Sequence, residues 1–115
     1  MSTTDLSDIV KSFVDAQSKL PSVVLSQVYY SNYTKNSLLK LNESIASLVR
    51  ISQQNDIQNY KQELRLIEIQ IHCVVQTIHW ALLHDYNAEE KCLDGLRLLG
   101  DALDRFGLFS GFLDI

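Results

Sequence analysis

Residues that interrupt helices are scarce in this sequence of 115 residues, which contains one proline and four glycines. Neither residue type occurs between Ser22 and Asp85. Strand-rich proteins need frequent turns, and turns favour glycine and proline, so their absence favours long helices. We therefore expect an all-α, elongated bundle of four to five helices with one long central helix. Residues 1–115 are expected to form a single helical-bundle domain.

Clusters of basic residues are also missing. The formal net charge is −4, and because residues 1–84 carry equal numbers of acidic and basic side chains, the whole surplus lies in residues 85–115. Nucleic-acid binding normally requires clustered Lys and Arg, so no nucleic-acid partner is expected. A partner recruited by charge should be basic and should meet the C-terminal segment.

The N-terminal residues lack the basic and apolar regions of a signal peptide, and no run approaches the roughly 20 apolar residues of a membrane span. We therefore expect an intracellular protein, in the cytoplasm or the nucleus, without a membrane span. Cys73 and Cys92, the two cysteines, are then expected to be free thiols, because reducing compartments disfavour disulfides.

Motifs for catalysis are absent from the sequence. It has neither a Gly-x-Ser-x-Gly turn nor a glycine-rich phosphate loop. The nitrogen and sulfur side chains available to zinc do not have the spacing of a metal site: His72, Cys73, His79, His84 and Cys92. We expect no enzymatic activity, no catalytic residue, no cofactor and no metal.

Capping residues and apolar periodicity predict the first helices. One helix is predicted to begin near Thr4 and to end at Pro21, which then occupies the first turn of the next helix. The phase of the apolar residues changes further on, which predicts a break or kink around residues 32–36. Residues 53–56 are predicted to connect to the following helix.

The segment 57–84 has two apolar faces on a helical wheel. The broad face consists of Leu64, Ile67, Ile71, Val74, Val75, Ile78 and Leu82. The narrow face, almost opposite, consists of Leu66, Ile69, Cys73 and Trp80. A helix with two apolar faces either runs through the middle of a bundle or has its second face covered by another chain. A strand is the alternative, because β-branched and polar residues partly alternate from Leu64 to His72.

Asn87 and Glu90 resemble a capping box at the start of the last helix. This helix is predicted to end near Phe106, with Gly107 in the left-handed position that often terminates helices. The residues that follow form an apolar tail, which includes Phe109 and Phe112. We expect the tail to fold back onto the core or to dock in a partner.

Residues 92–104, Cys-Leu-Asp-Gly-Leu-Arg-Leu-Leu-Gly-Asp-Ala-Leu-Asp, resemble the BH3 motif of apoptosis regulators, although Cys92 stands where a larger apolar residue is usual. The resemblance implies that an apolar stripe enters a receptor groove and that Asp101 lies opposite a groove arginine, with Gly100 at the tight helix contact. The stripe would consist of Leu96, Leu99 and Leu103. The alternative is a core-facing helix whose Gly100 permits close packing.

These patterns favour a non-enzymatic protein–protein interaction subunit, adaptor or scaffold of an intracellular multiprotein complex. It would bind through the narrow face of the long helix and through the C-terminal helix and tail. The candidate interface residues are Leu66, Ile69, Cys73, Trp80, Leu96, Leu99, Asp101, Leu103, Phe109 and Phe112. A helical homodimer of coiled-coil type, a BH3-like ligand and a small enzyme or carrier with an apolar pocket are the alternatives.

Overall fold

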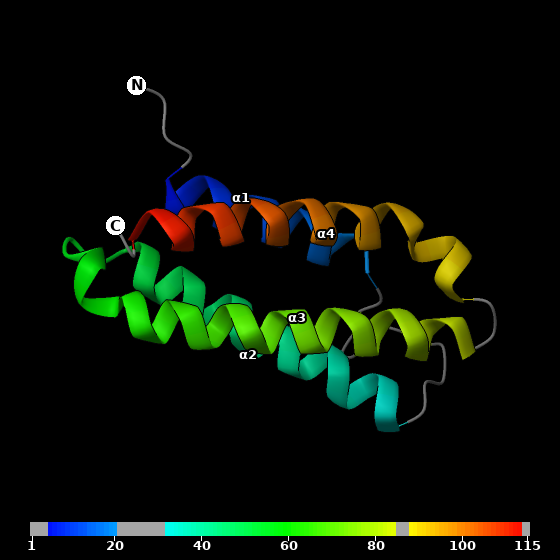
Figure 1. The fold of residues 1–115 in the computed structure, drawn as a ribbon. Helices are drawn as coiled ribbons and strands as arrows, with labels where there is room; N and C mark the ends of the chain where they lie inside the picture. Colours follow the sequence, from blue (N-terminus) through cyan, green and yellow to red (C-terminus); the bar gives the residue numbers. More distant parts are fainter. Residues whose placement is uncertain (1–4, 21–31, 85–87, 114–115) are drawn as a thin grey trace.

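The fold is all-helical over the described part of the chain (Figure 1). The structure is a computed structural model that describes residues 5–20, 32–84 and 88–113, with the side chains of all of these except 32, 33, 84, 88–91 and 112. A one-turn 3-10 helix, η1, precedes the third α-helix. The elements are α1 (Leu6–Ser18), α2 (Asn32–Ser52), η1 (Ile57–Tyr60), α3 (Lys61–His84) and α4 (Ala88–Leu113). The all-α prediction is confirmed, and the strand alternative for the segment around Leu64 is wrong.

The four α-helices lie side by side along one axis (Figure 1). α3 packs against both α2 and α4, and α1 packs against α4 and α2. The molecule measures 44 × 23 × 21 Å. Helices of 24 and 26 residues, α3 and α4, are about 36 to 39 Å long at 1.5 Å per residue. The two long helices therefore set the long dimension of the bundle, whereas the sequence predicted one long helix.

The core runs the length of the bundle and draws large apolar side chains from all four helices. Phe13 of α1 and Phe106 of α4 are both fully buried, with ring centroids 6.0 Å apart and ring planes at 88°. This is the edge-to-face geometry that aromatic rings prefer. The fully buried large side chains are Phe13, Phe106, Leu6, Ile9, Leu41, Leu48, Ile51, Leu64, Ile71, Ile78, Leu82 and Leu99.

The N-terminus of α1 is capped one residue later than predicted. Oδ1 of Asp5 accepts a hydrogen bond from the backbone N–H of Asp8 at 3.0 Å, which satisfies one of the unpaired donors of the first turn. Thr4 lies outside the described residues, as do Pro21 and the helix predicted to start there. α1 ends at Ser18, close to the predicted stop.

The predicted break around residues 32–36 does not interrupt α2, which begins at Asn32 and is continuous to Ser52. The buried side of its first turns includes Thr34 and Ser37 beside the apolar Leu38, so small polar side chains share the inward face there. The earlier apolar stripe, with which the change of phase was predicted, lies outside the described residues. The predicted connection at 53–56 lies between α2 and η1.

α4 also continues past its predicted end, through Gly107 to Leu113. The inward spacing persists beyond Phe106, because Phe109 and Leu113 pack against the core. One glycine inside a helix costs about 1 kcal/mol. Burial of a stripe at intervals of three and four residues stabilises the helix by more than that cost. Phe109 and Leu113 of the apolar tail therefore pack on the molecule's own core, whereas Leu108 is exposed. Asn87, the predicted cap, lies outside the described residues.

Candidate functional site

The outer side of α3 carries a stripe of exposed apolar side chains. We call this stripe, together with the polar Gln76 that lies within it, the α3 face and define it as Leu66, Ile69, Cys73, Gln76, Trp80 and Leu83. Its four large apolar side chains are more than half exposed, at 63% for Leu66, 56% for Ile69, 57% for Trp80 and 51% for Leu83. The broad face of the same helix is buried in the core. The second apolar face predicted from the sequence is therefore open in the isolated chain.

The residues of the α3 face alternate at intervals of three and four over two and a half heptads. This is the spacing of the a and d positions of a coiled coil, where residues meet a partner helix. Cys73 and Gln76 form the two smaller central layers, and large side chains lie on both sides of them. The apolar pattern of the sequence predicted four of these residues, and Gln76 and Leu83 were not among them. The heptad spacing itself was the signal for them.

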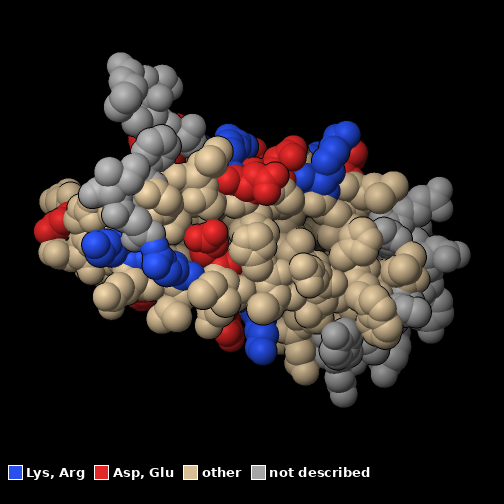
Figure 2. Space-filling model, viewed as in Figure 1, with Lys and Arg blue, Asp and Glu red and all other residues tan. Residues whose placement is uncertain are grey.

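The second half of α3 contains no charged residue. From Ile69 to His84 the sequence has no Asp, Glu, Lys or Arg. Figure 2 shows the consequence: charged side chains lie over α4, over the start of α3 and at the lower edge below its middle, whereas the surface over the rest of this half of α3 lacks them. Covering a charged surface requires desolvation of ions, which is costly. The α3 face can be covered without that cost.

A groove of about 350 Å³ lies between α2 and α3, next to the α3 face. Ile69 and Cys73 of the face line it from α3, and Lys40 and Glu43 stand on the α2 side. A hollow that adjoins an exposed helical stripe can accept a side chain from a helix laid along the stripe. The groove therefore widens the candidate site towards α2.

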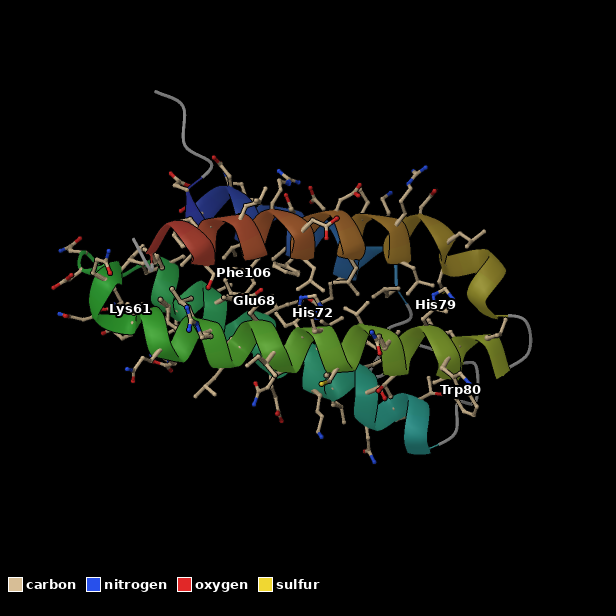
Figure 3. All side chains as sticks on the ribbon, viewed as in Figure 1. Lys61, Glu68, His72, His79, Trp80 and Phe106 are labelled. Atoms are coloured by element: carbon tan, nitrogen blue, oxygen red, sulfur yellow. The ribbon has the colours of Figure 1, made fainter. Side chains whose placement is uncertain are left out.

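The opposite edge of the α3 face is polar. Glu68, His72 and His79 lie on the α4 side of α3, whereas Trp80 lies on the side away from α4 (Figure 3). Nε2 of His72 is 3.9 Å from Oε2 of Glu68. Interfaces commonly have such an arrangement, with an apolar centre and a polar, solvated rim.

Three of the candidate interface residues on α4 are buried, unlike those of the α3 face. Leu96, Leu99 and Leu103 are buried in the bundle core, where they face α1 and α3 rather than solvent. Asp101 is exposed, Phe109 is half-buried against the core, and the side chain of Phe112 lies outside the described residues. These three leucines could bind in a receptor groove only if α4 first separated from the bundle.

The tight helix contact expected at Gly100 is instead at Gly95. A Cβ on Gly100 would meet nothing within 4 Å, so the expectation of close packing there is wrong. A Cβ on Gly95 would lie 3.1 Å from the backbone carbonyl of Lys19 and 3.0 Å from Leu20. Gly95 therefore lets the end of α1 approach α4 closely. The two glycines fall one and a half turns apart, and the sequence alone does not distinguish them.

The described side chains show no arrangement for metal binding, because no three His, Cys, Asp or Glu residues among them are grouped to hold a metal ion. A second surface hollow lies between α1 and α4, and two of the side chains that line it, Ser12 and Arg105, bond to each other. There Nη2 of Arg105 donates to Oγ of Ser12 at 2.6 Å, and the Ser12 hydroxyl lies 3.1 Å from the carbonyl oxygen of Asp8. These contacts tie α1 to α4.

Residues Ile57–Leu83 are long and apolar enough to cross a membrane, with a mean hydropathy of 1.3 over 18 residues, although the sequence was expected to contain no span. The segment has a high mean hydropathy because it carries no charged residue after Glu68. Its apolar residues are interrupted by uncharged polar ones, so no unbroken apolar run indicated a span. This is weak evidence for a membrane segment, because a helix that lines the core of a water-soluble bundle passes the same test.

Comparisons with known proteins leave the site to be interpreted from its geometry: no protein-family model, no curated protein and no solved structure matches this chain.

Proposed function

We propose that this protein is a non-enzymatic interaction subunit or adaptor of an intracellular multiprotein complex, and that the α3 face holds a helix of another chain. One observation carries the proposal: a helix that already contributes one face to the core exposes a second apolar stripe with heptad spacing and no charge. Contiguous exposed apolar surface of several hundred Å² is typical of interaction sites in soluble proteins.

The composition of the α3 face fits this role. Trp80 presents a large, rigid ring, and tryptophan is among the residues most often found at the energetic centre of an interface. Burial of apolar surface contributes about 25 cal/mol per Å² before the costs of association. The four large side chains supply most of that surface, and the adjoining groove accepts a side chain from the bound helix.

The site also defines the chemistry of its partner. The bound helix should carry an apolar stripe at heptad spacing to match the large apolar side chains of the α3 face. A charged residue on it could be paired only at the α2 edge, where Lys40 and Glu43 line the groove. Acidic residues occur elsewhere, on the outer side of α4, where Asp101 and Asp104 are exposed. A partner that extends onto α4 would be favoured by basic residues there.

The test is a double substitution on the α3 face, Leu66→Glu with Ile69→Glu, compared with Leu108→Glu on α4. Leu108 is 69% exposed and lies outside the α3 face, so it controls for the added charge. The double variant should fold, by circular dichroism, and should lose a partner that co-purifies stoichiometrically with the wild-type chain and the Leu108 variant. A partner retained equally by all three proteins would refute the proposed use of this face.

A further inference from the structure

We infer that the helix bound on the α3 face is α3 of a second copy of this chain, in antiparallel orientation. The inference rests on the proposed function, because it names the partner of the same site. It is carried by the order of side chains along the stripe and by the distribution of charge along α3.

The order of side-chain sizes along the α3 face is nearly the same in both directions. In an antiparallel pair each a position meets a d position of the other helix. We place the two-fold axis midway between Cys73 and Gln76. Leu66 of one copy then meets Leu83 of the other. Ile69 of one copy meets Trp80 of the other. Cys73 then meets Gln76. The outer layers thus pair large apolar side chains, the central layer pairs the Cys73 thiol with the Gln76 amide, and two-fold symmetry repeats each contact.

Charge favours the same orientation. All the charged residues of α3 lie in its first two turns, namely Lys61, Glu63, Arg65 and Glu68. A parallel pair would place these turns at the same level in both copies. An antiparallel pair places each beside the uncharged last turns of the other copy, so the charged residues of the two α3 helices do not meet.

Two other features agree with a second copy. The uncharged centre of the stripe needs no opposite charge on a partner, so it is complementary to itself. It is also poorly suited to a lipid surface, since helices that lie on membranes carry Lys and Arg along the polar face, whereas α3 has neither after Arg65.

The dimensions set the expected strength of the dimer. The stripe from Leu66 to Leu83 is about 25 Å long at 1.5 Å per residue. One helix pair with its flanking residues corresponds to an interface of about 1,000 Å² in total, at the lower end of specific interfaces. We therefore expect a dissociation constant in the micromolar range.

Sedimentation equilibrium of the full chain between about 1 and 200 μM is the first test, a range that brackets micromolar dissociation. The mass should rise from 13.1 kDa to twice that value.

Leu66→Glu with Ile69→Glu should weaken the dimer about 100-fold or more, because two carboxylates enter an apolar centre. Trp80→Ala, which adds no charge, should weaken it less. Leu108→Glu should leave it unchanged. A wild-type chain that stays monomeric, or a dimer unaffected by the double variant, would overturn the inference.

Cross-linking tests the orientation. Leu66→Cys and Leu83→Cys are made separately in a Cys73→Ser background, where the remaining Cys92 is buried. In an antiparallel dimer, mild oxidation should join a Leu66→Cys chain to a Leu83→Cys chain. A parallel dimer would instead join like chains only, because the two positions would be about 25 Å apart along the axis, and that product would overturn the antiparallel arrangement.

Failure of the inference is distinguishable from failure of the proposed function. If the wild-type chain is monomeric but binds a different purified protein, and Leu66→Glu with Ile69→Glu abolishes that binding, the second copy is excluded and the proposed function stands. If it is monomeric and binds neutral phosphatidylcholine vesicles through the same residues, both proposals are excluded.

Discussion

Phe13 and Phe106 meet edge to face in the middle of the bundle, and both are fully buried. They join α1 to α4, two helices that are far apart in the sequence. The core therefore depends on this pair for both apolar burial and helix registry.

We predict that Phe106→Ala lowers the free energy of unfolding by about 3 to 5 kcal/mol, since it removes a buried ring and leaves a cavity. Urea unfolding followed by circular dichroism measures this change. Leu108→Ala, at an exposed position two residues away, should change it by less than about 0.5 kcal/mol. A double-mutant cycle with Phe13→Ala should show a coupling of about 0.5 to 1.5 kcal/mol. Equal effects of the two α4 substitutions would contradict the packing described.

Asp5 acts at the end of α1 through one hydrogen bond to the backbone of Asp8. Replacing Asp5 by Ala should cost about 1 kcal/mol, because a donor of the first turn loses its partner. Asp5→Asn should retain most of the stability, since the amide oxygen also accepts a hydrogen bond from that N–H. Thermal unfolding of the two variants gives the comparison, and identical melting curves would argue against the cap.

At the scale of elements, α4 shows how much depends on neighbours that the sequence does not reveal. Its glycines are alike in a sequence pattern, yet Gly95 abuts the end of α1 and Gly100 faces open space. The predicted stop at Gly107 failed for a related reason. Glycine ends a helix only where no buried stripe continues beyond it, and Phe109 and Leu113 continue the stripe.

Alanine substitutions at the two glycines should therefore have opposite effects. Gly100→Ala should stabilise the protein by about 0.5 to 1 kcal/mol, because it restricts the unfolded chain and meets no neighbour. Gly95→Ala should destabilise it by about 1 to 3 kcal/mol, since the added carbon would press on the backbone of Lys19. Chemical denaturation of both variants tests the difference in sign, and stabilisation by both would contradict the close approach at Gly95.

At the scale of the whole molecule, the α3 face runs along the long axis. A dimer formed through it would place two bundles side by side, with α3 near the middle of the assembly. Such a dimer would be thicker than the single chain but hardly longer.

Small-angle X-ray scattering should detect this shape. At concentrations where the wild-type chain dimerises, the length of the particle along its long axis should stay close to the 44 Å of one bundle, while the radius of gyration rises clearly above 14.5 Å. The variant Leu66→Glu with Ile69→Glu should give values close to those of one bundle at the same concentration. A wild-type assembly about twice as long as one bundle would place the contact at an end instead.

The sequence by itself determined the helical class and the two faces of α3, since both follow from local periodicity and from the lack of turn residues. Local periodicity also located the connection after α2. It did not decide which apolar face is covered, because the narrow stripe of α3 and the Leu96 stripe of α4 look alike as patterns. Only the tertiary structure decided that the α4 stripe fills the core and the α3 face remains open. Burial depends on which helices become neighbours, and that choice is made by packing across the whole bundle.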